Sequence, residues 1–340
     1  MGFHMVGVAS AAPTIFHEEY HRWLAQGMHG SMEYLARNLD RRLDSRMLLD
    51  GAAKSILMVG VNYYSDEREG PGTPATCNPR EGLIARYARG TDYHEVMLSA
   101  LRVLENWVSA HYPEALSRCY VDTGPLLERE TAQRAGLGWV GKHTLLLNNE
   151  WGSYFFLGAM VTSLPLEPDE PAQSHCGTCT RCIDACPTGA ITEPYVVDAR
   201  LCLSYLTIEQ KETIPGRFLK AVSGSPSRVF GCDICQEVCP FTNRFSKPMT
   251  WPQIESRIPS GSINLISMLN STPQQFSEQF RGSPLKRAKL RGMQRNVLAA
   301  MGNGDSADEL AFIADVAETH EEDLVRRQAN IILDNAKESG

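Results

Sequence analysis

The 340-residue sequence has no hydrophobic run long enough to cross a membrane. A transmembrane helix needs about 20 consecutive apolar residues, whereas the longest apolar run, residues 154–161 (YFFLGAMV), contains Gly158 and has the length of a β-strand. The first residues also lack the basic segment, apolar stretch and small-residue cleavage site of a secretory signal peptide. We therefore expect a cytoplasmic protein without a membrane-spanning segment.

Signatures of several enzyme classes are absent as well. The sequence has no complete Walker A loop, no GxSxG elbow and no GxGxxG turn after a predicted strand, so nucleotide, hydrolase and dinucleotide functions have no support. The corrinoid signature Asp-x-His-x-x-Gly begins at Asp92 and His94 but has Met97 in place of the glycine. Histidine ligation of a corrinoid through that motif is therefore not expected.

Charge is distributed unevenly along the chain. The net charge of −7 is accounted for by residues 301–340, where ten acidic residues face three basic ones, so the preceding part is neutral overall. Residues 281–295 (RGSPLKRAKLRGMQR) hold six basic residues and no acidic one. A solvated helix face is the favoured interpretation of this basic segment. The alternative is a patch that binds a polyanion.

Cysteine is concentrated in one short segment. Eight of the ten cysteines lie within residues 176–239, which indicates metal binding rather than disulfides in a chain without an export signal. The upstream run has the spacing of bacterial ferredoxins, in which three thiolates bind one [4Fe–4S] cluster and the cysteine before proline reaches the other. That run is Cys176-x2-Cys179-x2-Cys182-x3-Cys186-Pro187.

The downstream run, Cys232-x2-Cys235-x3-Cys239-Pro240, is one ligand short, and Cys202 can supply it. Zinc is the alternative metal, but it does not explain the ferredoxin spacing or the two Cys-Pro pairs. Cys77 and Cys119 are interpreted as spare or buried thiols. The predicted ligand sets are Cys176, Cys179, Cys182 and Cys239 for cluster 1, and Cys186, Cys202, Cys232 and Cys235 for cluster 2.

The remaining pattern predicts an α+β protein of three domains. Residues 1–168 read as mixed α and β, with helices over 16–26 and 94–111, strands over 55–64, 118–121, 144–147 and 154–161, and a polar loop over 65–79. A proline-rich linker at 165–174 leads into the cysteine-rich domain, 169–248. Residues 249–340 contain amphipathic helical stretches at 287–301, 307–316 and 322–335, which suggest a helical repeat region.

The most specific polar stretch is residues 120–142 (YVDTGPLLERETAQRAGLGWVGK). Asp122 stands at the end of a predicted strand and before a predicted helix, so its carboxylate suits either a helix N-cap or a chemical acid, and the cap is the commoner use. Residues 135–142 (AGLGWVGK) form a glycine-rich turn at which backbone can approach a ligand closely. A tight interdomain turn is the alternative.

Five sequence blocks, in this order, resemble the epoxyqueuosine reductase family. They are YARGTDYH at 87–94, VDTGPLLER at 121–129, GLGWVGKHT at 136–144, the CxxCxxCxxxCPTGAI run from Cys176, and VFGCDICQEVCP at 229–240. The similarity covers roughly residues 1–250, and the helical tail is similar to the HEAT-like region of that family. The resemblance implies a cobalamin-binding N-terminal domain, a ferredoxin-like domain with two [4Fe–4S] clusters, and removal of the epoxide oxygen of epoxyqueuosine at the wobble position of tRNA.

The resemblance also implies roles for individual residues. Asp122 becomes the proton donor to the departing oxygen, which reverses the preference for a cap and calls for a pKa raised by desolvation. His94 and Arg129 are placed at the active site. The residues expected to line cobalamin are Tyr87, Gly136, Gly138, Trp139, Gly141 and Lys142.

The expected partners are the anticodon stem-loop of tRNA, gripped by the basic segment, and an external electron donor, with the chain a monomer. The chain opens almost directly on GFHMVGV, so a helix found upstream in relatives is expected to be missing or the start misassigned. The helical tail is short for the family, which predicts a reduced RNA-binding surface. Three alternatives remain: a dehalogenase-like corrinoid reductase of small molecules, a plain electron-transfer protein, and a cluster-bearing scaffold without chemistry.

Overall fold

The computed structural model describes residues 2–65, 80–258, 260–302 and 306–339. Its largest sheet has four antiparallel strands in the order β1-β2-β7-β4. These strands are β1 (Met5–Ser10), β2 (Ser55–Asn62), β7 (Phe155–Thr162) and β4 (Ser117–Tyr120). The strands β2 and β7 lie at the centre and are buried on both faces, as the continuous apolar run at 55–64 predicts.

Helices cover both faces of this sheet. On one face lies α3 (Tyr93–His111), which packs so closely that a side chain at Gly158 would clash with Leu101. The other face is covered by α4 (Glu128–Arg134) and the 3₁₀ turn η2 (Ser45–Leu49). The short helices α1 (His17–Ala25) and α2 (Leu39–Leu43) precede η2. Because β4 and α3 both end beside this sheet, their adjoining loops are held in fixed positions.

A second, three-stranded sheet joins distant parts of the chain. Its order is β10-β3-β11, with β3 (Glu81–Ile84) parallel to β10 (Arg228–Phe230) and antiparallel to β11 (Ser262–Asn264). One strand comes from each of the three predicted domain ranges. The ranges 1–168, 169–248 and 249–340 therefore share a sheet, and the domain boundaries stay a prediction.

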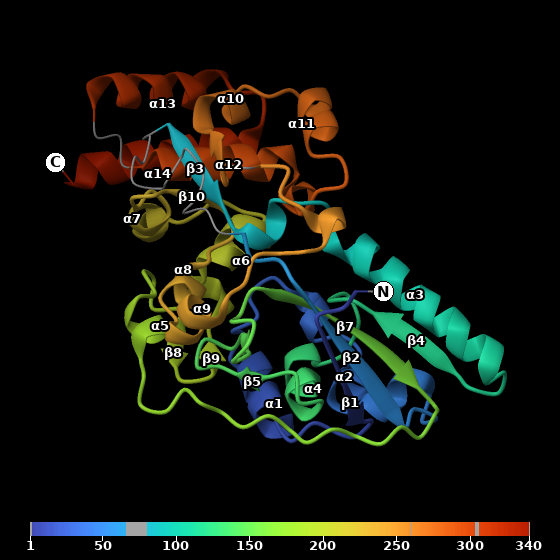
Figure 1. The fold of residues 1–340 in the computed structure, drawn as a ribbon. Coiled ribbons are helices and arrows are strands. Elements are labelled where there is room, and N and C mark those ends of the chain that lie inside the picture. Colours follow the sequence, from blue (N-terminus) through green and yellow to red (C-terminus); the bar gives the residue numbers. More distant parts are fainter. Residues whose placement is uncertain (1, 66–79, 259, 303–305, 340) are drawn as a thin grey trace.

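The C-terminal helices pack on this second sheet and form the larger core. Figure 1 shows them at the top, with the four-stranded sheet at the lower right. These helices are α10 (Leu265–Leu269), α11 (Pro273–Gln279), α12 (Lys289–Met301), α13 (Ala307–Thr319) and α14 (Asp323–Ser339). Helix α12 is buried on all sides from Gly292 to Ala300, so the predicted amphipathic pattern is wrong for most of this helix.

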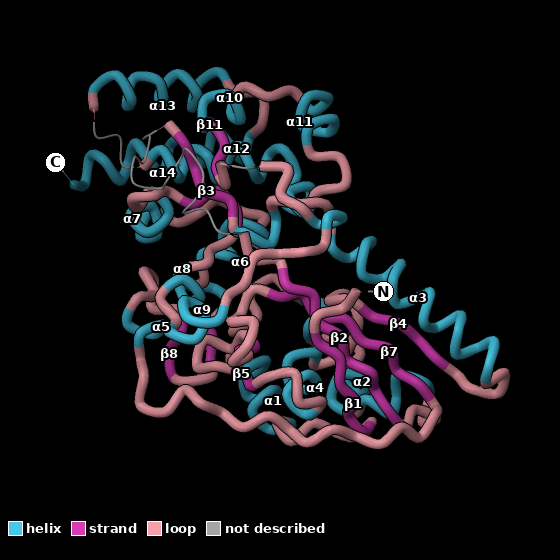
Figure 2. The backbone as a smooth tube through the Cα atoms, in the orientation of Figure 1, coloured by secondary structure: helices cyan, strands magenta, loops and turns pink. Residues whose placement is uncertain are grey.

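The cysteine-rich segment consists of short elements joined by long loops (Figure 2). Its helices are α5 (Arg181–Asp184), α6 (Leu203–Ile208), α7 (Leu219–Val222), α8 (Ile234–Glu237) and α9 (Pro240–Phe245). Two small hairpins, β5-β6 (Trp139–Val140 with Leu146–Leu147) and β8-β9 (Ile191–Glu193 with Val196–Val197), complete the fold.

The predicted helices at 16–26 and 94–111 and the strands at 55–64, 118–121 and 154–161 are confirmed within two residues. The strand predicted over 144–147 is shorter, because only Leu146 and Leu147 pair with β5. The loop predicted over 65–79 lies almost entirely outside the described residues, as does Cys77. In the part of the chain that the structure describes, no helix is both long and apolar enough to span a membrane.

Candidate active site

Asp122 occupies a strained turn directly after β4. Its φ of 57° is in the left-handed region, which aspartate tolerates better than most residues. The backbone N–H of Asp122 donates to Glu128 Oε1 over 2.7 Å, and the N-terminal cap of α4 is Leu127. The cap interpretation of Asp122 is therefore wrong: Glu128 reaches back to hold the turn, and the Asp122 carboxylate is left available.

Two side chains from the start of α3 bind that carboxylate. The Tyr93 hydroxyl donates to Asp122 Oδ2 over 3.1 Å, and His94 Nε2 lies 3.3 Å from the same oxygen. On the other side of the imidazole, His94 Nδ1 lies 2.6 Å from Asp92 Oδ1. Asp92 also caps α3 by accepting from the His94 backbone N–H. The imidazole is thus fixed between two carboxylates.

This arrangement determines the charges. Desolvation raises the pKa of Asp122, but the hydrogen bond and charge of His94, the Tyr93 hydroxyl and the Arg129 charge outweigh it, so the net pKa lies below its usual value. Desolvation lowers the pKa of His94, but Asp122 and Asp92 raise it to about 9. These contacts favour the ionised pair His94⁺/Asp122⁻ at neutral pH, and the expectation of a raised pKa for Asp122 is wrong.

The side chain of Asp122 is 63% exposed, although desolvation is the largest influence on its pKa. Both statements hold for a carboxylate that solvent reaches although many protein atoms lie around it. Since water there screens the charges, the direction of the shift matters more than its size.

Glu128 is a site residue that the sequence did not single out. Desolvation and the nearby charge of Asp122 raise its pKa to about 8. A largely neutral Glu128 can therefore accept the Asp122 N–H without placing a second full charge beside Asp122. Its position six residues after Asp122 in the block VDTGPLLER was visible, but nothing in the spacing showed the return contact.

Arg129 lies close enough to lower the pKa of Asp122, yet its guanidinium donates to the Thr144 carbonyl over 2.8 Å. Next to Thr144, His143 is 4% exposed, and burial followed by the Arg129 charge lowers its pKa to about 4. His143 Nδ1 accepts from Leu145 N–H over 3.1 Å, so the proton is on Nε2. That buried Nε2 has no hydrogen-bond partner among the described residues.

The His143 Nε2–H, near Arg129, is therefore a buried donor without a partner among the described residues. Buried donors in native proteins nearly always find a partner, so a bound group with a polar acceptor would satisfy it. A donor of this kind fits a polar, amide-bearing cofactor such as cobalamin.

The glycine-rich turn packs against the cysteine-rich segment. Trp139 is 2% exposed and lies among Cys176, Cys239 and Phe241. Lys142 Nζ donates to the carbonyls of Gly177 and Cys179 over 2.7 and 3.0 Å.

Three glycines of the same turn meet protein atoms where a side chain would begin. The contacts are Glu170 O at Gly136, Leu147 O at Gly138, and the side chains of Leu147 and His143 at Gly141. The contacts that the structure describes are thus with protein, and a role of this turn in lining cobalamin stays a prediction.

Seven of the eight cysteines fall into two neighbourhoods, which follow from the effect that each has on the pKa of the others. Burial raises the pKa of Cys182, and Cys239 and Cys176 add to the effect. Burial raises the pKa of Cys232 to about 11, with Cys202 contributing, and Cys186 contributes likewise at Cys202. The pKa of Cys235 is raised mainly by burial, with contributions from Cys232 and Cys202 and a weaker one from Cys182 of the other neighbourhood.

Donors directed at sulfur support a cluster at these positions. The buried Trp139 Nε1 beside Cys176 and Cys239 has no partner among the described residues, and the N–H of Ala190 donates to Cys186 Sγ over 3.2 Å. Hydrogen bonds to sulfur are one of the ways in which proteins tune iron–sulfur clusters. None of these eight cysteines forms a disulfide among the described residues, and neither does Cys119, whose pKa burial raises to about 12.

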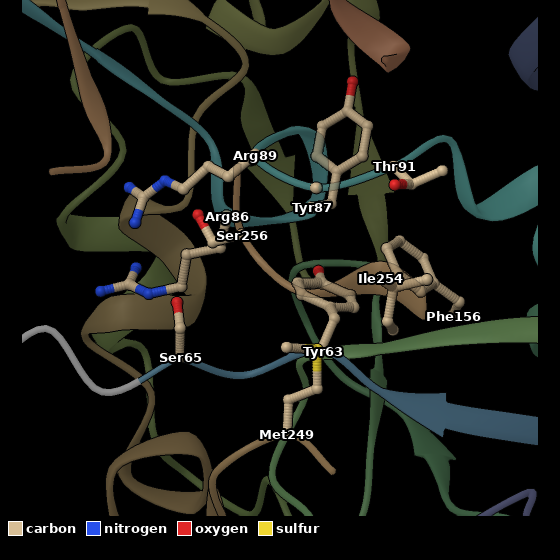
Figure 3. Close-up of a pocket in the computed structure, with 11 residues that line it drawn as sticks. Tyr63, Ser65, Arg86, Tyr87, Arg89, Thr91, Phe156, Met249, Ile254 and Ser256 are labelled. Carbon is tan, nitrogen blue, oxygen red and sulfur yellow. The ribbon is translucent and has the colours of Figure 1, made fainter. Parts of the chain in front are cut away.

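Tyr87 connects the Asp122 site with the second cysteine neighbourhood. Desolvation raises the pKa of Tyr87, and both Asp122 and Asp233 add to it, so the ring stands near both carboxylates. Asp233 adjoins Cys232 and accepts the Arg86 backbone N–H over 2.8 Å. Figure 3 shows the small pocket that Tyr87 helps to line, with Arg86 and Arg89 directed away from Phe156 and Ile254. Its volume of about 10 Å³ holds one water at most and excludes a cofactor.

Two other sequence features are resolved by the structure. His17-Glu18-x-x-His21 matches the HExxH pattern of zinc proteases. Both histidines are exposed on α1, and among the described residues no three His, Cys, Asp or Glu side chains could hold a metal ion. The described residues therefore give the HExxH pattern no support as a zinc site.

In the basic segment, Arg295 is 1% exposed, so the expectation that the whole segment faces solvent is wrong at this residue. The other five basic side chains are exposed: Arg281, Lys286, Arg287, Lys289 and Arg291.

Comparisons with known proteins agree with this geometry. Residues 175–242 match the family model described as a 4Fe-4S double cluster binding domain, and residues 42–123 match the model described as Epoxyqueuosine reductase QueG, DUF1730. The epoxyqueuosine reductase of Cellulophaga algicola is 40% identical over 300 residues, covering 87% of this chain and 93% of that protein. The Escherichia coli enzyme is 38% identical over 303 residues, covering 89% of this chain and 78% of that protein.

A solved structure of epoxyqueuosine reductase with an epoxyqueuosine-modified tRNA-Tyr stem loop is also similar. It superimposes with a TM-score of 0.86 at 28% identity, covering 98% of this chain and 87% of that one. Similarity of this extent includes the Asp122 turn and both cysteine runs. The chain therefore belongs to the epoxyqueuosine reductase family, which depends on cobalamin and two [4Fe–4S] clusters.

Proposed function

We propose that this protein reduces epoxyqueuosine to queuosine at the wobble position of tRNA, with Asp122 as the proton donor. The observation that carries the proposal is an acid on a fixed turn, bound by Tyr93 and His94, beside two cysteine neighbourhoods. The solved relative that contains an epoxyqueuosine-modified stem loop supports this substrate. The substrate also implies a cytoplasmic location, where tRNA is modified.

Cobalamin, when bound, supplies low-valent cobalt as the reductant, with single electrons reaching it through the clusters. The chain's own residues position the substrate and move protons. Asp122 gives a proton to the oxygen that leaves, and the Tyr93 hydroxyl orients the Asp122 carboxylate. Arg129 adds positive charge that stabilises the carboxylate after the proton has gone.

The cluster ligands are proposed as two crossed sets. Cys176, Cys179, Cys182 and Cys239 hold cluster 1, and Cys186, Cys202, Cys232 and Cys235 hold cluster 2. The neighbourhoods described above support this division. Because Tyr87 stands between Asp122 and Asp233 next to Cys232, cluster 2 is the one nearer the substrate in this proposal.

The exposed part of the basic segment is proposed as the tRNA grip. Arg287 bonds Glu209 over 3.0 Å and lies over the Tyr34 ring at 5.8 Å. The charge of Asp122 contributes to the raised pKa of both Tyr34 and Arg287, so these side chains border the active site. A target base must leave its stack to reach such a site, and an aromatic ring beside a cation suits that purpose.

We further propose that the helices from α10 to α14 form a HEAT-like unit, that the chain acts as a monomer, and that an external low-potential protein supplies the electrons. The succession of α12, α13 and α14, packed side by side, supports the repeat.

The test is an anaerobic assay on epoxyqueuosine-containing tRNA with reconstituted clusters, cobalamin and a strong reductant. Asp122→Asn keeps the size of the side chain but removes the proton, so we expect queuosine formation to fall by a factor of about 100 or more. Asp50→Asn is the matched control, because Asp50 is another aspartate with left-handed φ (52°), and its exposed carboxylate accepts from Arg41. Full activity in Asp122→Asn would overturn the proton-donor assignment.

The tRNA grip is tested by neutralising Lys286, Lys289 and Arg291 together. If each contacts one phosphate, affinity falls and the slope of log K against log salt decreases by about 2 to 3. Neutralising Lys54, Lys220 and Lys337 removes the same charge elsewhere and serves as the control. An unchanged salt slope in the first variant would leave the segment a solvated face.

A further inference from the structure

The proposed reaction requires more protons than Asp122 holds. Removing an epoxide oxygen breaks two C–O bonds, forms one C=C bond, and releases water with two new O–H bonds. Each turnover therefore consumes two electrons, supplied one at a time by the external reductant, and two protons. In the resting chain the pKa of Asp122 lies below its usual value, so its carboxylate starts without the first proton.

We propose that His94, held by Asp92, is the proton store that recharges Asp122 during the reaction; this inference rests on the function proposed above. The three side chains form one line, with 2.6 Å from Asp92 Oδ1 to His94 Nδ1 and 3.3 Å from His94 Nε2 to Asp122 Oδ2. His94 touches Asp122 directly, whereas Asp92 acts through the imidazole and is a positioning residue. Bound to Asp92, Nδ1 carries a proton in either state, so Nε2 is the nitrogen that gives and regains one.

Substrate binding supplies the driving force for the transfer. The ionised pair His94⁺/Asp122⁻ and the neutral pair His94/Asp122-H contain the same single proton. Water stabilises the ionised pair, and a bound nucleoside that excludes water from the 63% exposed Asp122 favours the neutral pair. The proton then moves to Asp122, which passes it to the leaving oxygen.

The second proton follows the same route. His94 is 31% exposed, so it can regain a proton from solvent while substrate covers Asp122. The relay thus joins solvent, His94 Nε2, Asp122 Oδ2 and the substrate oxygen in that order.

Charged and titratable groups from several elements face this line, and none displaces His94 as the donor. Glu128 of α4 bonds the Asp122 N–H rather than the carboxylate, and Arg129 bonds Thr144. The groups facing the line are Asp92 and Tyr93 at the start of α3, Asp122, Glu128 and Arg129 around α4, Tyr87 of η4 (Arg86–Ala88), Tyr34 of η1 (Glu33–Leu35), and Arg287 of η8 (Pro284–Ala288).

The first test measures the titration of His94 without any turnover. The holoenzyme, with oxidised clusters, Co(III) cobalamin and ¹⁵N-labelled histidine, is followed by NMR against pH, and His94→Gln identifies the resonance. We expect a His94 pKa of about 9, and a lower one in Asp92→Asn, in which the hydrogen bond and charge of Asp122 remain. Glu95→Gln, which removes one negative charge from the exposed side of the same helix turn, should leave it unchanged. A His94 pKa near 6.5 in the wild type, or no fall in Asp92→Asn, overturns the proposal.

The second test measures single-turnover queuosine formation at pH 6 and pH 8. Because Asp92→Asn lowers the His94 pKa from about 9, the protonated fraction of His94 falls more at pH 8 than at pH 6, so Asp92→Asn should lose more of the wild-type rate at pH 8 than at pH 6. A merely structural role of Asp92 predicts equal loss at both pH values, which overturns the relay. So does an undiminished rate in His94→Gln. If the wild type forms no queuosine at all, the proposed function fails, and the NMR titration still decides the relay.

Discussion

Arg295 provides a test of how the helical region is attached to the cluster domain. Its guanidinium is buried and donates to three backbone carbonyls of α6 and the segment after it: Leu206 at 2.8 Å, Gln210 at 2.6 Å and Glu212 at 2.6 Å. It also donates to the neighbouring Asn296 Oδ1. Helix α6 begins just after Cys202, a proposed ligand of cluster 2. Replacing Arg295 by methionine keeps an unbranched chain in the space but removes the donors to all four oxygens.

The cost can be worked from these contacts. An unsatisfied buried acceptor costs about 1–3 kcal/mol, so the three carbonyls and Asn296 Oδ1 together cost roughly 8 kcal/mol at the middle of that range. Burial of the charged guanidinium already carries a penalty, since it lowers the pKa of Arg295 from 12.5 to about 10. Removing the charge recovers about 3 kcal/mol. The expected net loss of stability for Arg295→Met is therefore about 5 kcal/mol.

The assay compares urea unfolding of anaerobic, cluster-loaded proteins by circular dichroism and by cluster absorbance. Because cofactor-bearing proteins often depart from two-state unfolding, the comparison is with Arg291→Met, an exposed arginine one turn earlier on α12. We expect the free energy of unfolding of Arg291→Met to lie within about 0.5 kcal/mol of that of the wild type. We also expect Arg295→Met to lose cluster 2 before cluster 1. If the two variants unfold alike, the carbonyl contacts of Arg295 do not hold the domains together.

Two further variants report on the site and on cluster 1. The raised pKa of Glu128, about 8, makes the folded state bind a proton that the unfolded state has released, so the stability of the wild type declines as pH rises from 5 through 8. Glu128→Gln keeps an acceptor for the Asp122 N–H, and its advantage over the wild type in thermal unfolding should grow by up to about 1.4 kcal/mol per pH unit over that window. A difference that stays constant with pH would contradict a buried, protonated Glu128. Lys142→Met removes the donor to the carbonyls of Gly177 and Cys179. We expect cluster 1 to become more labile to an iron chelator by about 1.5 kcal/mol, while cluster 2 persists. Lys54→Met is the control, and equal lability of both clusters in Lys142→Met would argue against a role of Lys142 in holding cluster 1.

The sequence predicted best what depends on short spacing. A [4Fe–4S] cluster requires several thiolates at fixed separations, so the spacing from Cys176 to Cys186 is enough to indicate cluster binding. The continuous apolar strand β2 is similar, because burial on both faces removes the polar alternation. These features could be predicted because their cause is local.

Features with a non-local cause could not be predicted. Arg295 looks like part of a basic surface in sequence, and its burial results from carbonyls that lie more than eighty residues earlier. Glu128 belongs to α4 but acts on the turn before it. The interpretation of Asp122 as a helix cap failed for the same reason: Leu127 begins the helix, and the partners of Asp122 come from α3.

The contacts around Arg86 make the active site and cluster 2 mechanically dependent on each other. Arg86 opens η4, the turn that carries Tyr87, and its side chain bonds Glu237 over 3.1 Å while its backbone bonds Asp233 over 2.8 Å. Arg228 of β10 bonds the second oxygen of Glu237 over 2.9 Å. Since Asp233 and Glu237 flank Cys235, the position of Tyr87 relative to cluster 2 is set by the same groups that hold the cluster loop. A change in that loop must therefore move the ring that borders Asp122. In the proposed function, electron delivery through cluster 2 and proton delivery by Asp122 then depend on one shared set of contacts rather than on two independent sites.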